Sequence, residues 1–145
     1  MGLTQQRLMG NAYPVLAVSF MQDNVAASQS DVQLFAAEVA SAAGIANDGY
    51  TMPWAGTIIG ISYQLSAAGS AGALTIGPTI NGTEAADPTL AVTIGTSGSD
   101  TALRGAAAFV AGDRIGAEIT TDGSWNGTSS DLLVTVFVVL EITGV

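Results

Sequence analysis

The fold is decided by two stretches in the second half of the chain: AGDRI at residues 111–115, which leads into a strand-like segment at 116–121, and LLVTVFVVL at residues 132–140. The first combines turn residues with a following row of alternating apolar side chains. The second is an apolar run rich in β-branched residues, which favours a strand, although a run this short also fits a buried helix. Together they are typical of the closing half of a β-sandwich.

Earlier segments alternate apolar and polar residues with the period of two that strands have. Strands are predicted on this basis at residues 15–20, 57–65, 73–80, 90–94 and 115–119. The clearest alternation has its inward row at Ile59, Ile61, Tyr63 and Leu65. Because the chain has 145 residues and Gly, Pro, Asn or Asp separates the segments, the sequence predicts one all-β domain with a single core.

Three other segments fill the spaces between these strands. Residues 31–43 fit either a strand or a helix, because they are rich in alanine but flanked by strand-like sequence. The dipeptide Asn81-Gly82 is a favoured turn, and residues 95–99 are expected to form a Gly- and Ser-rich loop. A further segment at 103–110 precedes the Ala-Gly-Asp turn.

Composition excludes several classes of function. Twelve acidic residues, three arginines and no lysine give a formal charge of −9, which repels nucleic-acid backbones. The absence of cysteine and histidine removes thiolate nucleophiles, imidazole bases and the common zinc, iron and copper sites. No apolar run approaches the roughly 20 residues of a membrane helix. We therefore expect no cofactor, no enzymatic activity, no nucleic-acid partner and no membrane partner.

The run at residues 132–140 is apolar on both faces. Leu132, Val134, Val136, Val138 and Leu140 make one row, and Leu133, Phe137 and Val139 lie on the other side. An antiparallel sandwich normally exposes one face of each sheet to solvent, so a second apolar face implies an arm, another subunit or a central position. Oligomerisation is the simplest interpretation, and it makes Leu133, Phe137 and Val139 the candidate subunit interface.

Four segments carry a resemblance to a known family. They are PWAGTIIGI at 53–61, TINGT at 79–83, FVAGDRI at 109–115 and the closing apolar strand. Over residues 33–142 they resemble compact jelly-roll domains of the tumour-necrosis-factor and C1q-like type, in the versions found in tailed-phage head decoration (cement) proteins and phage fibre tips. The resemblance implies an all-β, antiparallel jelly-roll sandwich at residues 31–145, preceded at residues 1–30 by an extended N-terminal arm and a first short strand.

The resemblance also implies a function. A decoration protein of this type is a homotrimer that clamps the major capsid protein on the outer surface of the phage head, after synthesis in the host cytoplasm, and its arm reaches along the shell. The alternative is a receptor- or glycan-binding tip of a fibre or surface appendage. Exposed aromatic residues would serve that alternative.

Four residues are candidate partner contacts. Trp54, Trp125 and Tyr50 are amphipathic aromatics of the kind that concentrate binding energy, and Arg7 lies in the expected arm. A tryptophan beside a proline, such as Trp54, more often caps one end of a sandwich core, so a packing role stays open for both tryptophans.

Two motifs imitate binding or modification sites. From Asp122 to Asp131 oxygen-bearing residues follow the spacing of a calcium loop, but Leu133 stands where such a loop has its glutamate. The patterns Asn81-Gly82-Thr83 and Asn126-Gly127-Thr128 match glycosylation acceptors. Turn chemistry explains the same residues, and we prefer it for both motifs.

Paired carboxylates are the one catalytic chemistry that the composition leaves. Asp113, Glu118 and Asp122 lie within one short segment, as the acid and base of a glycosidase could. On a strand these side chains diverge, and Asp113 is expected to fix its turn by accepting hydrogen bonds from nearby backbone amides. The sequence therefore does not predict an active site.

Overall fold

The computed structural model describes residues 13–36, 49–92, 95–127 and 130–142, and the regular structure in these ranges is all β. The strands are β1 (Val15–Gln22), β2 (Val32–Gln33), β3 (Tyr50–Thr51), β4 (Gly56–Leu65), β5 (Leu74–Ile80), β6 (Thr83–Glu84), β7 (Leu90–Val92), β8 (Ser97–Thr101), β9 (Ala107–Phe109), β10 (Arg114–Thr121) and β11 (Leu132–Leu140). Within these ranges no helix has the length and apolarity that crossing a membrane requires.

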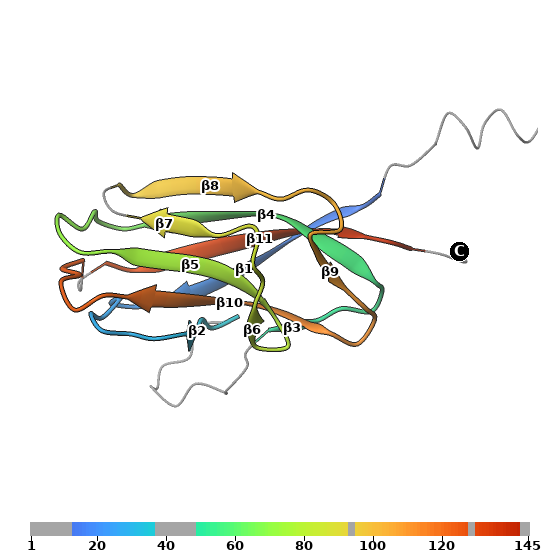
Figure 1. Ribbon diagram of the computed structural model, residues 1–145, viewed down its shortest axis with the longest axis horizontal. Coiled ribbons are helices and arrows are strands. Elements are labelled where there is room, and N and C mark those ends of the chain that lie inside the picture. The colour runs from blue at the N-terminus through green and yellow to red at the C-terminus, as the bar shows by residue number, and fades with distance from the viewer. Residues whose placement is uncertain (1–12, 37–48, 93–94, 128–129, 143–145) are drawn as a thin grey trace, which may run out of the picture.

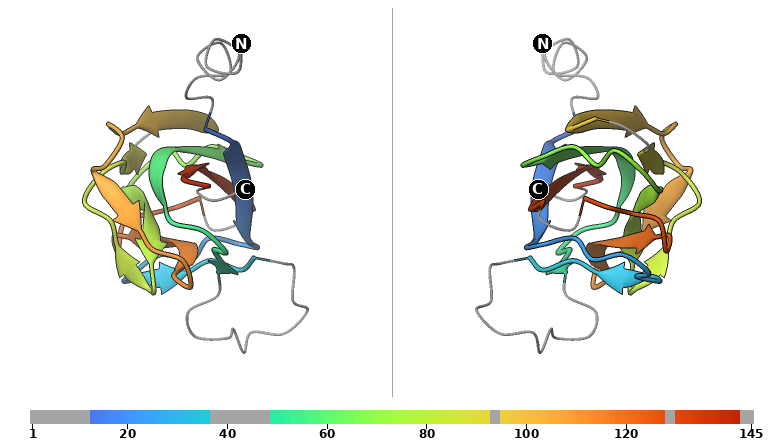
Figure 2. Two further views of the ribbon diagram at one scale, coloured as in Figure 1. Left: turned by 90° about the vertical axis from the view of Figure 1, so that its right-hand side faces the viewer. Right: turned by 90° about the vertical axis from the view of Figure 1, so that its left-hand side faces the viewer.

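The strands form two antiparallel sheets that face each other (Figure 1). The first sheet has the order β1-β11-β4-β8, and β9 also pairs with β4. The second has the order β2-β10-β5-β6, with β3 also on β10 and β7 also on β5. Viewed along the strands, the sheets curl around a common interior (Figure 2). The predicted all-β sandwich is confirmed.

The core lies between the sheets and is built mainly from the inward rows that the alternation predicts. The first sheet contributes Phe20 and Val136, and the second contributes Ile76 and Ile119, each at most 1% exposed. Burial of one such side chain stabilises a fold by roughly 1.5–3 kcal/mol. The two rows together hold the sheets face to face.

Strand β1 is part of the sandwich. It pairs with β11 over its whole length, from Val15 opposite Val139 to Gln22 opposite Leu132, and its Phe20 side chain is fully buried. The sandwich therefore includes residues 15–22, which the sequence grouped with the N-terminal arm. Residues 1–12, the first part of the expected arm, lie outside the described residues.

Strand β4 contains a β-bulge that changes its inward row. Phe137 of β11 pairs with Gly60, but the next residue, Val138, pairs with Ile58. The extra residue, Ile59, is half-buried, whereas Ile58 is fully buried. The predicted inward position of Ile59 is therefore wrong, because a bulge reverses the alternation on one side of it. Ile61, Tyr63 and Leu65 face the core as predicted.

Two segments differ from their sequence-based expectations. The expected loop at 95–99 overlaps strand β8, an edge strand that pairs with β4. Its Ser-Gly-Ser sequence has no apolar row, and Gly98 leaves the space that the Tyr63 ring fills. The ambiguous segment at 31–43 contains β2 and an isolated bridge from Phe35 to Met21, and residues 37–43 lie outside the described ones.

Candidate functional site

The outer face of the first sheet is free of charge. The strand registers place four rows of four residues on it: Met21, Leu133, Gln64 and Ser97; Ser19, Thr135, Ser62 and Ser99; Ala17, Phe137, Gly60 and Thr101; Val15, Val139, Thr57 and Ala108. None of the sixteen is acidic or basic, although the chain carries twelve acidic residues. We call these positions the uncharged face.

Phe137 lies near the centre of the uncharged face. A Cβ atom at Gly60, on the neighbouring strand, would be 3.8 Å from Cδ2 of Phe137 and 3.8 Å from the methyl group of Thr101. The Phe137 ring thus lies over β4 within van der Waals reach of position 60. Beside it, the hydroxyl groups of Ser19 and Thr135 are 3.2 Å apart and form a hydrogen bond between β1 and β11.

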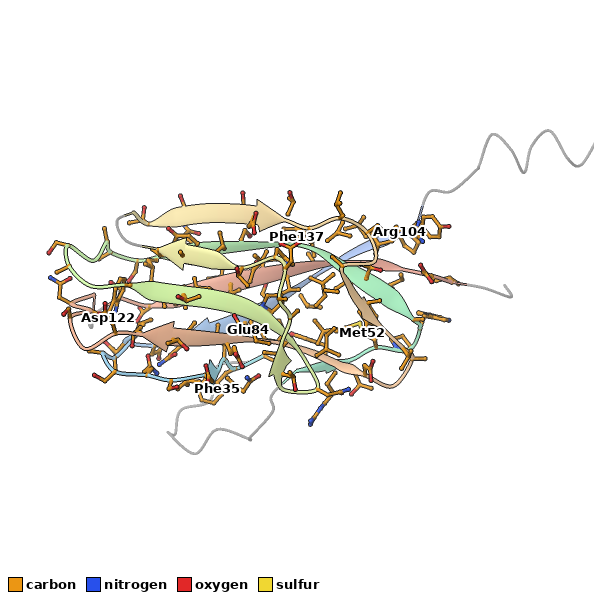
Figure 3. All side chains as sticks on the ribbon, in the orientation of Figure 1. Phe35, Met52, Glu84, Arg104, Asp122 and Phe137 are labelled. Atoms are coloured by element: carbon orange, nitrogen blue, oxygen red, sulfur yellow. The ribbon has the colours of Figure 1, made fainter. Side chains whose placement is uncertain are left out.

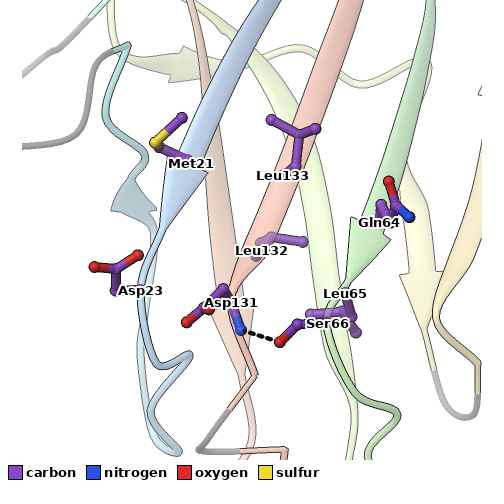
Figure 4. A pocket seen from close by; sticks show the side chains of 8 residues that line it. All are labelled: Met21, Asp23, Gln64, Leu65, Ser66, Asp131, Leu132 and Leu133. Atoms are coloured by element: carbon purple, nitrogen blue, oxygen red, sulfur yellow. Dashed lines mark hydrogen bonds between the residues drawn. The ribbon is translucent and has the colours of Figure 1, made fainter.

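Two hollows border on Leu133 and Gln64 at one end of the uncharged face. One, of about 400 Å³, reaches from Met21 on β1 to Asp23 and Asp131 (Figure 4). The other, of about 340 Å³, lies toward β8 and includes Ser97 and Thr135. The Leu133 side chain, 39% exposed, is therefore an apolar projection between two depressions. Such a surface can interdigitate with a partner.

The outer face of the second sheet has the opposite character. Glu118 of β10 is only 6% exposed there, and its carboxylate accepts a hydrogen bond from the side chain of Gln33. Glu84 lies over Gly77 on the neighbouring strand β5. Burial raises the pKa of Glu118, and repulsion by Glu84 and Asp31 raises it further. Three carboxylates, those of Glu118, Glu84 and Asp31, therefore lie close together on this face, whereas the uncharged face has none.

The three predicted interface residues all belong to the uncharged face. Leu133 is exposed, Phe137 is half-buried and Val139 is only 9% exposed. Strand β11 lies between β1 and β4, so its central position already covers Val139 without another subunit. Leu133 and Phe137 leave apolar surface that the described residues do not cover.

Trp125 is in the core. Its side chain is 3% exposed, and its indole N–H donates a hydrogen bond of 3.1 Å to the carbonyl of Val25. Gly69, Gly72 and Gly127 pack so closely against Trp125 that a side chain at any of them would collide with it. This corrects the expectation that Trp125 contacts a partner: it closes one end of the core, which is the packing role that the sequence left open.

The other predicted contact residues differ in their surroundings. Trp54 is 42% exposed, in the loop between β3 and β4. Tyr50 is exposed too, but its ring packs edge-on against Phe20, with 5.6 Å between centroids, and its hydroxyl donates a hydrogen bond to the carbonyl of Ala36. Arg7 lies outside the described residues. Trp54 is thus the described aromatic candidate with the freest side chain.

The calcium-like loop uses its oxygen atoms within the fold. Asp122 accepts hydrogen bonds from the backbone amides of Ser124 and Ala73, and the Asn126 side-chain oxygen accepts two more, from the amides of Ser70 and Ala71. Among the described residues, no group of three or more acidic side chains could hold a metal ion. The preferred explanation by turn chemistry fits these contacts.

Asp113 also behaves as the sequence predicts. Its carboxylate accepts hydrogen bonds of 2.8 Å from the backbone amide of Val110 and from the side-chain amide of Asn81, and these bonds lower its pKa. Asn81 and Gly82 have φ angles of 54° and 82°, which fits the predicted turn. Asp113 thus fixes the turn between β9 and β10 to the turn between β5 and β6.

The sequence did not identify the contribution of β1 to the uncharged face. Val15, Ala17 and Met21 occupy the outward positions of the strand that the alternation predicts from residue 15, so the alternation itself contains the signal. Two exposed apolar residues, Leu103 and Val110, were also missed, because they lie in connections without a periodic pattern. No protein-family model matches this sequence, and no curated protein is significantly similar to it.

Proposed function

We propose that this chain is a structural virion protein: a homotrimer that decorates the outer surface of a tailed-phage head and stabilises the shell by binding the major capsid protein. The uncharged face is the observation that carries the proposal. It gives the protein a broad surface for contact, whereas the carboxylates at Asp113 and Asp122 are occupied by hydrogen bonds within turns. The protein acts through buried surface and not through chemistry.

Charge explains why copies would meet at this face. Each chain has a formal charge of −9, so two copies repel each other wherever their carboxylates approach. The uncharged face avoids this repulsion, and Leu133 and Phe137 supply apolar area whose burial favours association. Asp23 and Asp131 lie at its border, where they can stay in water.

The strand order supports the jelly-roll interpretation. Short strands that share a partner can be counted as one position: β2 with β3, β6 with β7, and β8 with β9. The eight positions then pair first with eighth, second with seventh, third with sixth, and fourth with fifth. A long antiparallel hairpin rolled into two sheets has this pairing, which is the architecture of a jelly roll.

Trimer formation would multiply a weak contact with the shell. When one copy is bound, its two neighbours are held at high effective concentration over equivalent sites, so three weak contacts bind far more tightly than one. A decoration protein needs this, because it must cover a preformed surface without covalent chemistry.

The proposal is tested by adding the purified chain to empty shells assembled from the major capsid protein of the same virus. Co-sedimentation at a fixed ratio, with a raised melting temperature of the shell, is the expected result. The variant Leu133→Asp should lose trimer formation and shell binding together. Binding of soluble glycans by the purified chain, without binding to shells, would contradict the proposal and favour the fibre-tip alternative.

A further inference from the structure

Exposed apolar side chains gather at one end of the sandwich, where β1 begins and β11 ends. They include Trp54 at 42% exposure, Val110 at 63% and Leu103 at 85%, together with Tyr13. Single exposed apolar residues are ordinary, but several at one end mark an interaction site. We call these four residues the strand-end patch.

Backbone hydrogen bonds place three of these residues at the same end of the first sheet. The amide of Leu140 donates to the carbonyl of Pro14, and the amide of Glu141 donates to the carbonyl of Ala55. Gly56 pairs with Phe109 as well as with Leu140. The strand ends therefore line up across the first sheet. Tyr13 immediately precedes Pro14 and Trp54 immediately precedes Ala55, whereas Val110 immediately follows Phe109.

The contacts of Arg104 place the fourth residue, Leu103, at the same end. Its guanidinium lies 3.6 Å from the centre of the Tyr13 ring and forms a salt bridge of 2.8 Å with Glu141. Leu103, the neighbour of Arg104, is thus held beside the strand ends with its side chain in solvent. Figure 3 shows Arg104 near the end where β1 begins and Asp122 at the opposite end.

The two ends differ in charge. Both arginines that the structure describes, Arg104 and Arg114, lie toward the strand-end patch, together with two carboxylates: Glu141 is paired with Arg104, and Asp113 accepts a hydrogen bond from the amide of Val110. The loops at the opposite end carry Asp23, Asp122 and Asp131 and, within their described residues, no basic side chain. A basic partner would be drawn to the acidic loops. The strand-end patch suits a protein surface that offers apolar pockets and no excess of positive charge.

We propose that the strand-end patch is the surface by which the trimer binds the capsid shell, with the acidic loops pointing into solvent. This inference rests on the proposed decoration function and specifies its partner contact. Trp54 and Leu103 enter apolar pockets of the capsid protein, because exposed tryptophan and leucine bury the most apolar area per residue at this end. The contact depends weakly on salt, because it buries apolar surface and involves few charges.

The test compares shell binding of the wild-type trimer with three variants. Trp54→Ala should weaken binding by about 30-fold, the loss typical of one central interface tryptophan. Leu103→Asp should weaken it as well, and Ala68→Asp is the matched control, since it adds the same charge to an exposed loop at the opposite end. Light scattering and circular dichroism check that each variant keeps the wild-type mass and fold. Wild-type binding at about 0.1 M and 0.5 M salt should differ by less than roughly three-fold.

The outcomes distinguish a failure of this inference from a failure of the proposed decoration function. Binding by wild type and Ala68→Asp, with loss in both patch variants, supports the strand-end patch. Normal binding by Trp54→Ala and Leu103→Asp, or equal loss in Ala68→Asp, overturns the patch and leaves the decoration function standing. Failure of the wild-type trimer to bind shells overturns both. Binding to phosphatidylcholine vesicles in place of shells would identify a lipid surface as the partner and would likewise overturn both.

Discussion

Glu118 and Gln33 lie opposite each other on β10 and β2, and the side-chain amide of Gln33 donates a hydrogen bond to the Glu118 carboxylate. The hydroxyl of Thr79 donates in turn to the amide oxygen of Gln33, at 3.1 Å. The side chains of Glu118, Gln33 and Thr79 thus form a polar group on the outer face of the second sheet, where they are largely shielded from solvent. Burial raises the pKa of Glu118, Glu84 and Asp31 raise it by repulsion, and the bond from Gln33 offsets part of the effect.

The raised pKa gives the fold a pH dependence. The folded state binds the Glu118 proton more tightly than the unfolded state does, so the stability gained from this group is greatest below its unfolded pKa and is lost as pH rises through the folded pKa. Glu118→Gln keeps an acceptor for Gln33 and removes the charge. We expect its melting temperature at pH 7 to rise by about 2–4 °C, which corresponds to about 1 kcal/mol in a domain of this size. Thermal melts from pH 4 to pH 8 should show the difference from wild type vanishing at the acidic end, and an unchanged difference would contradict this account.

Asp113 should show the opposite pH dependence. The amide of Val110 and the side chain of Asn81 lower its pKa, so its contribution to stability is present above the unfolded pKa and is lost as pH falls. Asp113→Asn removes the charge that both bonds favour. Its melting temperature should fall below wild type at pH 7 and approach it in strong acid. Thermal melts at the two pH values measure this, and a variant as stable as wild type at pH 7 would exclude the proposed role in the turn.

Trp125 and Trp54 should respond very differently to truncation. Trp125→Ala removes a buried ring and its hydrogen bond to Val25, so we expect a loss of about 3–5 kcal/mol in the free energy of unfolding. Trp54→Ala removes an exposed side chain and should change that free energy by less than about 1 kcal/mol. Urea unfolding followed by circular dichroism compares the two. Similar losses would mean that Trp54 also belongs to the core.

Substitutions on the uncharged face should change association and leave the fold intact. Leu133→Asp places a carboxylate between the two hollows, and each copy would then carry that charge into the interface. We expect a folded monomer, because Leu133 is exposed in the single chain. Ala91→Asp adds the same charge at an exposed position of β7, in the second sheet, and should keep the wild-type mass. Sedimentation velocity distinguishes the two, and a Leu133→Asp variant with the wild-type mass would remove Leu133 from the interface.

Much of the fold follows from alternation in the sequence. The strands that carry apolar rows, such as β4 and β10, were predictable because the period of two is strong in them. The bulge at Ile59 was not, since a bulge depends on the pairing with β11 and leaves no local mark. Strand β8 was missed for a related reason: an edge strand of serine, glycine, aspartate and threonine gains its structure from its neighbour β4.

The candidate site was predictable only in part. The doubly apolar β11 indicated Leu133, Phe137 and Val139 directly. The rest of the uncharged face depends on which strands flank β11, and that order is a property of the whole topology. The burial of Trp125 depends on close approach by loop glycines from two different connections, which sequence spacing alone does not reveal.

The mass of the wild-type chain in solution tests the central claim most directly, because the uncharged face is proposed to be a contact between three copies. Multi-angle light scattering on the purified protein should give about three times the 14.5 kDa mass of one chain over a range of concentrations. A stable mass of 14.5 kDa would contradict the account, since the apolar surface at Leu133 and Phe137 would then remain uncovered in the free protein.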